Sequence, residues 1–173
     1  MADKLDLLDE TYEEDNIDNM YLTFRVADED YAVGIAYVIE IVGIQKFKRV
    51  PDVPEFIKGV INLRGKVIPI MDVRLRFGLP EKEYNDRTCI IVLEVDDVPT
   101  GIVVDEVSEV LEIPAEQISP PPAWQGASDK GVILGMGKLE NTVCAILDVS
   151  KFLFEQEIVL PEKFLEAENK EAA

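Results

Sequence analysis

The chain has 173 residues, of which 35 are acidic, 17 are basic and none is histidine, giving a formal net charge of −18. A composition of 47% apolar and 30% charged residues is typical of a soluble globular protein, and a chain of this length buries a sizeable core. The negative charge disfavours nucleic acid and anionic membranes as partners, and the lack of histidine excludes Ser-His-Asp catalysis, Cys-His catalysis and histidine metal ligands.

Residues 1–20 are acidic and carry few apolar side chains, so we expect this segment to be disordered. They contain no apolar signal segment, and no apolar run in the chain approaches the ~20 residues that span a bilayer. We therefore expect a cytoplasmic protein with no direct membrane insertion.

Alternating apolar and polar residues predict a hairpin over Tyr21–Ile35, with its turn at Asp28–Asp30. Tyr37–Ile44 is rich in valine and isoleucine and is expected to be extended. A polar loop with two prolines follows at Lys46–Pro54, and Pro54–Lys58 suits a single helical turn.

A second hairpin is predicted over Val60–Met71, across Arg64 and Gly65. Because an arginine resists positive φ, we favour a type I turn with Gly65 as a bulge residue over a type I′ turn. Pro69 cannot donate a hydrogen bond to a neighbouring strand, which indicates an edge strand or a bulge at that position.

The second half of the chain shows the same order of elements. Its predicted elements are a hairpin over Cys89–Val104 with a turn at Asp96–Asp97, an extended segment over Glu106–Ile113, a proline-rich loop over Pro114–Gln125 and a hairpin over Val132–Leu147. Asp148 is expected to cap a short helix over Val149–Leu153, as Asp72 caps one over Val73–Phe77. A terminal helix is predicted over Pro161–Lys170.

These two halves are copies of one small unit. Gly59–Phe77 aligns with Gly135–Leu153, and in the preceding segment Glu40 aligns with Glu109. A unit of this size buries its own hydrophobic face poorly, so we expect the copies to pack together and to leave a groove between them that binds a partner.

The elements predict an all-β fold of two packed five-stranded SH3-like β-barrels with short helices and a C-terminal helix. We divide the chain into an acidic segment (1–20), a two-barrel domain (21–155, with subdomains over 21–87 and 88–155) and an acidic C-terminal helix or tail (156–173). The long connections leave room for strands or the C-terminal helix to cross between the barrels.

The sequence offers no catalytic, cofactor-binding or metal-binding set. Cys89 and Cys144 each lie in an apolar, strand-like run, which indicates buried, inert thiols. The paired acids at Asp96–Asp97 and Asp105–Glu106 fit a turn and a strand end, and no glycine-rich phosphate loop is present.

Two charged residues indicate a binding surface. Glu40 lies in an otherwise apolar strand, and Arg64 lies at a hairpin tip, so sheet pairing can join them in a bidentate ion pair beside the groove. In the second copy Glu109 remains, but the residue aligned with Arg64 is Glu140. The alternative, that Arg64 is a solvated turn residue, stays open.

The basic residues are also concentrated in one region. Gln45–Phe77 holds eight of the 17 basic residues and only three acids. This basic island either meets an acidic protein surface or forms a solvated rim.

Phe56–Gly65 reads FIKGVINLRG and Val67–Asp72 reads VIPIMD, and together they resemble the signature of CheW, the family of bacterial chemotaxis coupling proteins. The resemblance extends from about Tyr21 to Leu153 and includes Gly101–Asp105 and Ala115–Ile118.

The resemblance implies two five-stranded barrels and a non-enzymatic adaptor without cofactors. It also implies two partners, namely the regulatory domain of a CheA-type histidine kinase and the cytoplasmic tip of methyl-accepting chemoreceptors. The residues implied to form the interaction surface are Val38, Glu40, Gly59, Asn62, Arg64, Thr88, Cys89 and Ile90.

Three alternatives remain at this stage. The chain could be the related domain of a CheV-type or other two-component regulator, although no receiver-like sequence follows Leu153. A small β-barrel enzyme would need the acids at Asp105–Glu106, and a nucleic-acid-binding barrel would need basic, aromatic strand faces.

Overall fold

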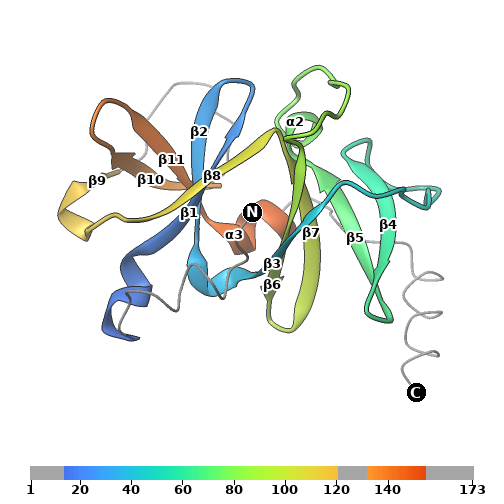
Figure 1. Ribbon diagram of the computed structural model, residues 1–173, viewed down its shortest axis with the longest axis horizontal. Helices are drawn as coiled ribbons and strands as arrows, with labels where there is room; N and C mark the ends of the chain where they lie inside the picture. Colours follow the sequence, from blue (N-terminus) through green and yellow to red (C-terminus); the bar gives the residue numbers. More distant parts are fainter. Residues whose placement is uncertain (1–13, 121–131, 155–173) are drawn as a thin grey trace.

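The computed structural model describes residues 14–120 and 132–154. These residues form eleven β-strands in two sheets with a few short helices, which confirms the prediction of an all-β fold of SH3-like barrels (Figure 1). None of the helices in these two ranges has the length and apolar character needed to cross a membrane.

The first sheet, called barrel A here, has the strand order β8-β1-β2-β11-β10-β9. Its strands are β1 (Met20–Val26), β2 (Glu29–Gly34), β8 (Glu106–Glu112), β9 (Ile118–Ser119), β10 (Ile133–Lys138) and β11 (Val143–Leu147). Neighbouring strands in this sheet are antiparallel, except that β2 and β11 are parallel to each other. The two-residue β9 makes this sheet six-stranded, where five strands were predicted.

The second sheet, called barrel B here, has the strand order β3-β6-β7-β5-β4. Its strands are β3 (Val38–Gly43), β4 (Ile57–Leu63), β5 (Lys66–Asp72), β6 (Cys89–Val95) and β7 (Val98–Val104). The β1–β2 hairpin thus joins strands from the second half of the chain, and the β6–β7 hairpin joins strands from the first. The sheets therefore do not follow the division between residues 87 and 88, because the two copies exchange hairpins.

Two short helices follow the corresponding hairpins of the two barrels, α2 (Val73–Arg76) and α3 (Val149–Phe154). Asp72 caps α2 by accepting a hydrogen bond from the Leu75 amide at 3.3 Å, and Asp148 caps α3 by accepting one from the Lys151 amide at 3.2 Å. Both predicted caps are confirmed. The predicted helix at Pro161–Lys170 lies outside the described residues.

The hydrophobic core has three parts, because several strands are buried on both faces. On β6, Ile90 and Val92 point into barrel B, whereas Ile91 and Leu93 point into a larger core that also contains Leu22 and Phe24 of β1. A third cluster, Ala32, Ile113, Cys144 and Ile146, fills barrel A. The central cluster joins the two barrels, as expected for copies that cannot bury their faces alone.

Several local expectations are corrected. Residues 1–20 were expected to be disordered, but Glu14–Asn19 form a 3-10 helix and Met20 is 1% exposed in β1. The expectation is therefore wrong for residues 14–20, because Ile17 and Met20 pack on the central core. Residues 1–13 lie outside the described part. The first hairpin turns at Ala27 and Asp28, both with positive φ, one residue earlier than expected. Pro69 lies on β5, which pairs with β4 on one side and with β7 on the other. The pairing with β7 begins one residue later, at Ile70.

Candidate partner-binding surface

Glu40 and Arg64 form an ion pair, as their positions in the sequence predicted. β3 is an edge strand of barrel B, and Glu40 follows an irregularity in its pairing with β6. Nη1 of Arg64 donates a hydrogen bond to Oε1 of Glu40. The Arg64 side chain is 75% exposed while that of Glu40 is 17% exposed, so the guanidinium remains available to a partner.

The turn that presents Arg64 differs from the expected one. Arg64 has φ +54° and Gly65 has φ +83°, and Leu63 pairs directly with Lys66, so the loop is a two-residue turn of the type I′ kind. The twist of the paired strands favours this turn over the type I turn and bulge, although arginine is not well suited to it. Asn62 supports the turn by accepting a hydrogen bond from the Gly65 amide at 3.0 Å.

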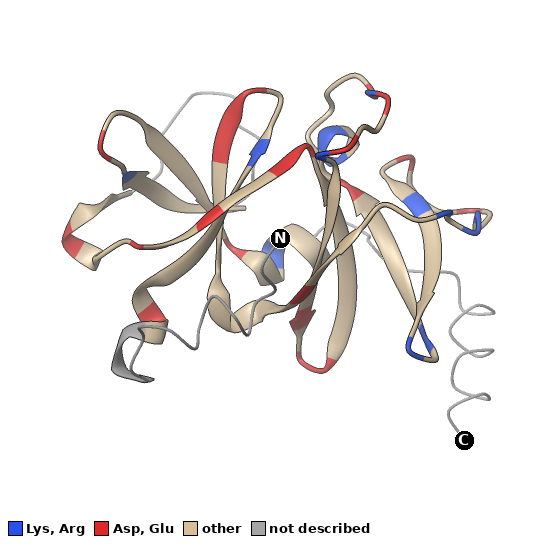
Figure 2. Ribbon diagram, viewed as in Figure 1, with Lys and Arg blue, Asp and Glu red and all other residues tan. Residues whose placement is uncertain are grey.

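A shallow depression of about 250 Å³ adjoins the ion pair. Its lining includes Ile39, Glu40, Arg64, Val92, Glu94 and Pro99. Ile39 is 39% exposed, so an apolar side chain lies beside the charged pair at the surface. Figure 2 shows the basic tip of the β4–β5 hairpin near acidic residues of β3 and of the β6–β7 end.

A larger groove lies between the two barrels, as the packing of the copies predicted. It has a volume of about 740 Å³ and is lined from barrel A by Tyr21 and Leu134 and from barrel B by Glu94 and Asp96. Its charged lining residues, Asp18, Glu94, Asp96 and Asp148, are all acidic. Glu94 also lines the smaller depression, so the two hollows adjoin at this residue.

Four of the implied surface residues have little exposed surface. Val38 and Ile90 are 1% and 0% exposed, and Thr88 and Cys89 are also buried. Thr88 accepts a hydrogen bond from the Asn85 amide at 2.9 Å, and the start of β6 that it precedes pairs with the end of β3. Their side chains contribute to the packing of β3 and β6, and direct contact of these residues with a partner stays a prediction.

The fold itself requires a glycine at position 59. A Cβ built at Gly59 would lie 2.3 Å from the carbonyl oxygen of Lys48, and Gly59 has φ +145°. The Lys48 and Val60 backbones are joined by hydrogen bonds at this point. The backbone that approaches Gly59 therefore belongs to the chain itself, and the implied place of Gly59 in the interaction surface stays a prediction.

The two cysteine thiols, the remaining groups that could be reactive, are part of the packed interior. Cys89 and Cys144 are free and buried, and burial raises the pKa of both thiols, which keeps them protonated. Residues 14–120 and 132–154 contain no group of three or more acidic, cysteine or histidine side chains arranged to hold a metal ion.

Two exposed apolar residues that the sequence analysis missed lie on the groove. Tyr37 is 41% exposed and Leu134 is 57% exposed, and both line it. Tyr37 belongs to a 3-10 turn (Ile35–Tyr37) where an extended segment was predicted. Because its exposure depends on that turn and on the meeting of two distant segments, no local sequence pattern reveals it.

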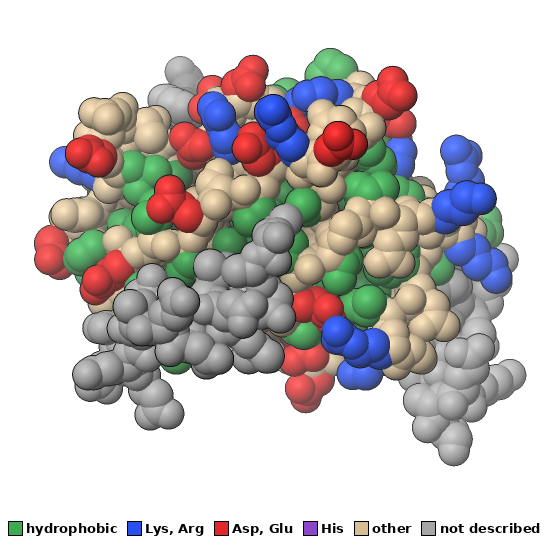
Figure 3. All heavy atoms as spheres, in the orientation of Figure 1, with side chains coloured by type: hydrophobic (Ala, Val, Ile, Leu, Met, Phe, Trp, Pro, Cys, Tyr) green, Lys and Arg blue, Asp and Glu red, His purple; other side chains and the backbone are tan. Residues whose placement is uncertain are grey.

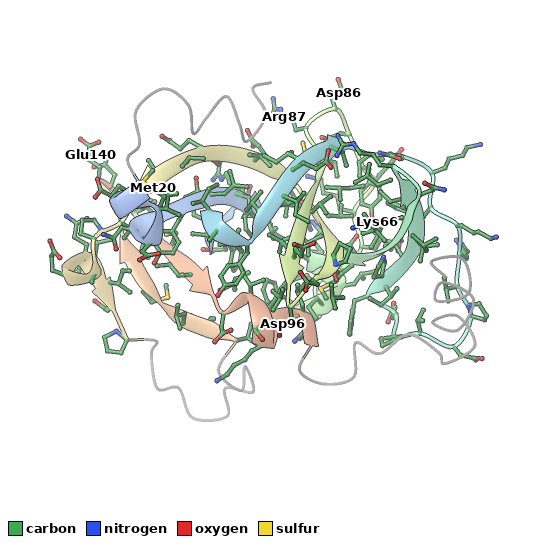
Figure 4. All side chains as sticks on the ribbon, turned by 90° about the horizontal axis from the view of Figure 1, so that it is seen from below. Met20, Lys66, Asp86, Arg87, Asp96 and Glu140 are labelled. Atoms are coloured by element: carbon green, nitrogen blue, oxygen red, sulfur yellow. The ribbon has the colours of Figure 1, made fainter. Side chains whose placement is uncertain are left out.

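The equivalent hairpin tip of barrel A lacks the pair. Glu140 lies at that tip in barrel A, and Lys66 flanks the Arg64 turn in barrel B, in separate halves of the molecule (Figure 4). Glu109, the counterpart of Glu40, forms no ion pair with any residue in the described ranges; its backbone is hydrogen bonded to Thr23. The charged pair is therefore particular to barrel B.

Comparisons with known proteins agree with this geometry. The model of the family described as "CheW-like domain" matches residues 20–157. The chemotaxis protein CheW of Klebsiella aerogenes is 38% identical over 140 residues, which cover 81% of this chain and 84% of that protein. That of Bacillus subtilis is 36% identical over 132 residues, covering 76% and 85%. The crystal structure of the scaffolding protein TtCheW from Thermoanaerobacter tengcongensis has a TM-score of 0.75 at 32% identity and covers 83% of this chain and 99% of its own.

Proposed function

This chain belongs to the CheW family of chemotaxis scaffold proteins, and from that premise we propose that it couples methyl-accepting chemoreceptors to a CheA-type histidine kinase. It acts as an adaptor that holds both partners at once. We place it in the cytoplasm, where the receptor tips and the kinase meet.

The adaptor works by passive docking, without catalysis. The paired acids considered for chemistry have structural places: Asp96 and Asp97 form the β6–β7 turn with positive φ, and Asp105 accepts hydrogen bonds from Arg74. The chain has no histidine, and its two cysteines are buried. These contacts leave the surface described above as a binding surface rather than a reaction site.

The groove between the barrels fits the helical tip of a receptor. Its exposed Tyr37 and Leu134 supply apolar contact area, and its acidic rim selects a partner with basic side chains at the edge. The kinase domain, itself CheW-like, requires a separate face, so that both partners bind together.

The Glu40–Arg64 pair is the observation that carries this proposal most directly. Arg64 is largely exposed, is held by one carboxylate and stands beside exposed Ile39. Such a guanidinium can bind a partner's carboxylate or carbonyl without a change in the fold.

The test is a binding titration of Arg64→Ala against a CheA-type kinase and against a receptor fragment. We expect affinity for at least one partner to fall by about 1–3 kcal/mol, roughly 5- to 150-fold, because a charged hydrogen bond is lost. Arg25→Ala is the matched control, since it breaks the exposed Arg25–Asp30 pair of barrel A, whose atoms are 3.4 Å apart. Unchanged affinity for both partners would remove Arg64 from the binding surface.

A further inference from the structure

A third hollow, called the basic depression here, lies at the end of barrel B away from the Arg64 turn. It has a volume of about 620 Å³. Its apolar lining includes Phe47, Val53 and Ile57; its charged lining residues are the basic Lys46, Arg49 and Lys58 and the acidic Glu55 and Glu81. Strand β4 begins at Ile57 in this depression and ends at Leu63 beside the partner-binding surface, so the two sites are separated by the length of the strand.

Most of the cations in this region lack an acidic partner. Lys46, Lys48 and Arg49 are exposed and form no ion pair with any residue in 14–120 or 132–154. Lys58 is paired with Glu81, with 3.0 Å between Nζ and Oε1. Figure 3 shows several exposed basic side chains at the barrel B end, although others lie along the upper edge and near the centre of this face. On a chain with a net charge of −18, this cluster attracts an acidic segment.

The chain leaves its last described helix close to this depression. The Arg76 guanidinium lies over two rings, 5.5 Å from the centroid of Phe56 and 5.4 Å from that of Phe152. Nε of Arg76 also donates a hydrogen bond to the Phe152 carbonyl oxygen at 3.3 Å. Leu75 and Ile57, the neighbours of Arg76 and Phe56, both line the depression, and α3 ends two residues after Phe152.

We propose that the acidic segment of residues 155–173 docks on the basic depression of its own chain. The segment carries six acids and two lysines, together with the apolar run Ile158–Leu160, which matches the charged rim and the apolar lining. A short tether gives an effective concentration on the order of millimolar, so weak surface ion pairs are sufficient for docking. The docked segment shields the basic island from other acidic surfaces, and salt releases it.

Residues 1–13 form the other acidic segment, but they join the described chain at a point that disfavours docking on the basic depression. The residues that follow it, Ile17 and Asp18, line the groove between the barrels rather than the basic depression. Among the described residues, the charged side chains that line that groove are all acidic, and they repel a second acidic segment.

Paramagnetic relaxation in the full chain tests the proposal. A nitroxide attached through Ala167→Cys labels one site, because Cys89 and Cys144 are buried. We expect broadening of the amide signals of residues 45–58 at low salt and its loss near 1 M salt, where the screening length falls to about 3 Å. The double variant Lys46→Glu with Arg49→Glu should reduce this broadening roughly threefold or more, since several surface ion pairs are lost together.

Two further variants make the result specific. Lys138→Glu changes an exposed lysine of barrel A and should leave the broadening unchanged. Replacing Glu155, Glu157 and Glu162 by lysine in the double variant should restore the broadening, because the charges of both sides are then exchanged. Broadening that is absent, that centres on another surface, or that persists in the Lys46→Glu and Arg49→Glu variant would overturn the proposal. The assay contains neither kinase nor receptor, so its outcome is independent of the adaptor function.

Discussion

Arg74 holds Asp105 with two hydrogen bonds at the junction of the two barrels. Nε donates to Oδ1 at 3.0 Å and Nη2 donates to Oδ2 at 2.6 Å, while the Ala27 amide also donates to Oδ2 at 2.9 Å. Asp105 lies between β7 of barrel B and β8 of barrel A, where the chain crosses from one barrel to the other. Arg74 belongs to α2, which follows barrel B, and Ala27 belongs to the β1–β2 turn of barrel A. One carboxylate therefore ties both barrels at the crossing.

Loss of this carboxylate should destabilise the protein substantially. We expect Asp105→Ala to lower the free energy of unfolding by about 2–3 kcal/mol, because three hydrogen bonds to a charged, partly buried group are lost and Arg74 is left without its partner. Urea denaturation measures the change. Asp30→Ala breaks the more exposed Arg25–Asp30 pair and should cost less than about 1 kcal/mol. Equal costs for the two variants would contradict a special role for Asp105.

The same carboxylate should make stability depend on pH. Burial raises the pKa of Asp105, but the hydrogen bonds from Arg74 and Ala27 and the guanidinium charge outweigh it, so the pKa lies below its ordinary value of 3.8. A folded pKa below the unfolded one gives stability that is fully present above pH 3.8 and is lost as the pH falls through the folded pKa. The difference in unfolding free energy between the natural chain and Asp105→Asn should thus be constant at neutral pH and shrink below about pH 4. A difference that stays constant down to pH 3 would show that Asp105 titrates normally.

Gly59→Ala should damage the fold rather than partner binding alone. The added Cβ meets the Lys48 carbonyl oxygen at 2.3 Å, and φ +145° is strained for any residue with a side chain. We expect a loss of about 3 kcal/mol or more in unfolding free energy, from strain and overpacking together. Gly43→Ala on β3 is the control, since a Cβ there has no atom within 4 Å. A Gly59→Ala variant as stable as the natural chain would reopen a direct contact role.

Local pattern predicted the hairpins, the Asp72 and Asp148 caps and the approach of Arg64 to Glu40. The hairpins and caps depend on residues close in sequence, where periodicity and capping chemistry are informative, whereas Glu40 and Arg64 were linked because a lone charge in an apolar strand needs a partner. The local sequence pattern did not specify the exchange of hairpins between the barrels. The pairing of β1 with β8 joins segments that are distant in the chain, and strands of either copy have apolar faces suitable for such pairing. The structural need for a glycine at position 59 was not predicted for the same reason, since the atom that excludes a Cβ comes from the preceding loop.

Tyr84→Phe should loosen the segment that leads into β6. The Tyr84 hydroxyl donates a hydrogen bond to Oδ2 of Asp72 at 2.7 Å, and Asp72 is 1% exposed. Burial and the Asp72 carboxylate raise the pKa of Tyr84, so the hydroxyl keeps its proton at neutral pH. Removing it leaves a buried carboxylate oxygen without this donor, at a cost of about 1–3 kcal/mol. Amide hydrogen exchange should increase over residues 79–88, whereas the exposed Tyr37→Phe should change neither exchange there nor stability.

Arg64 should separate the stability of the turn from partner binding. At φ +54° an ordinary side chain is strained, whereas asparagine tolerates this conformation and Asn-Gly is favoured in a type I′ turn. Arg64→Asn and Arg64→Ala both remove the ion pair to Glu40, so the comparison between them isolates the backbone effect. We expect Arg64→Asn to be more stable than Arg64→Ala by about 0.5–1 kcal/mol, while both bind the partner equally weakly. If partner affinity instead followed stability across the two variants, the arginine would act through the conformation of the turn and not through its guanidinium.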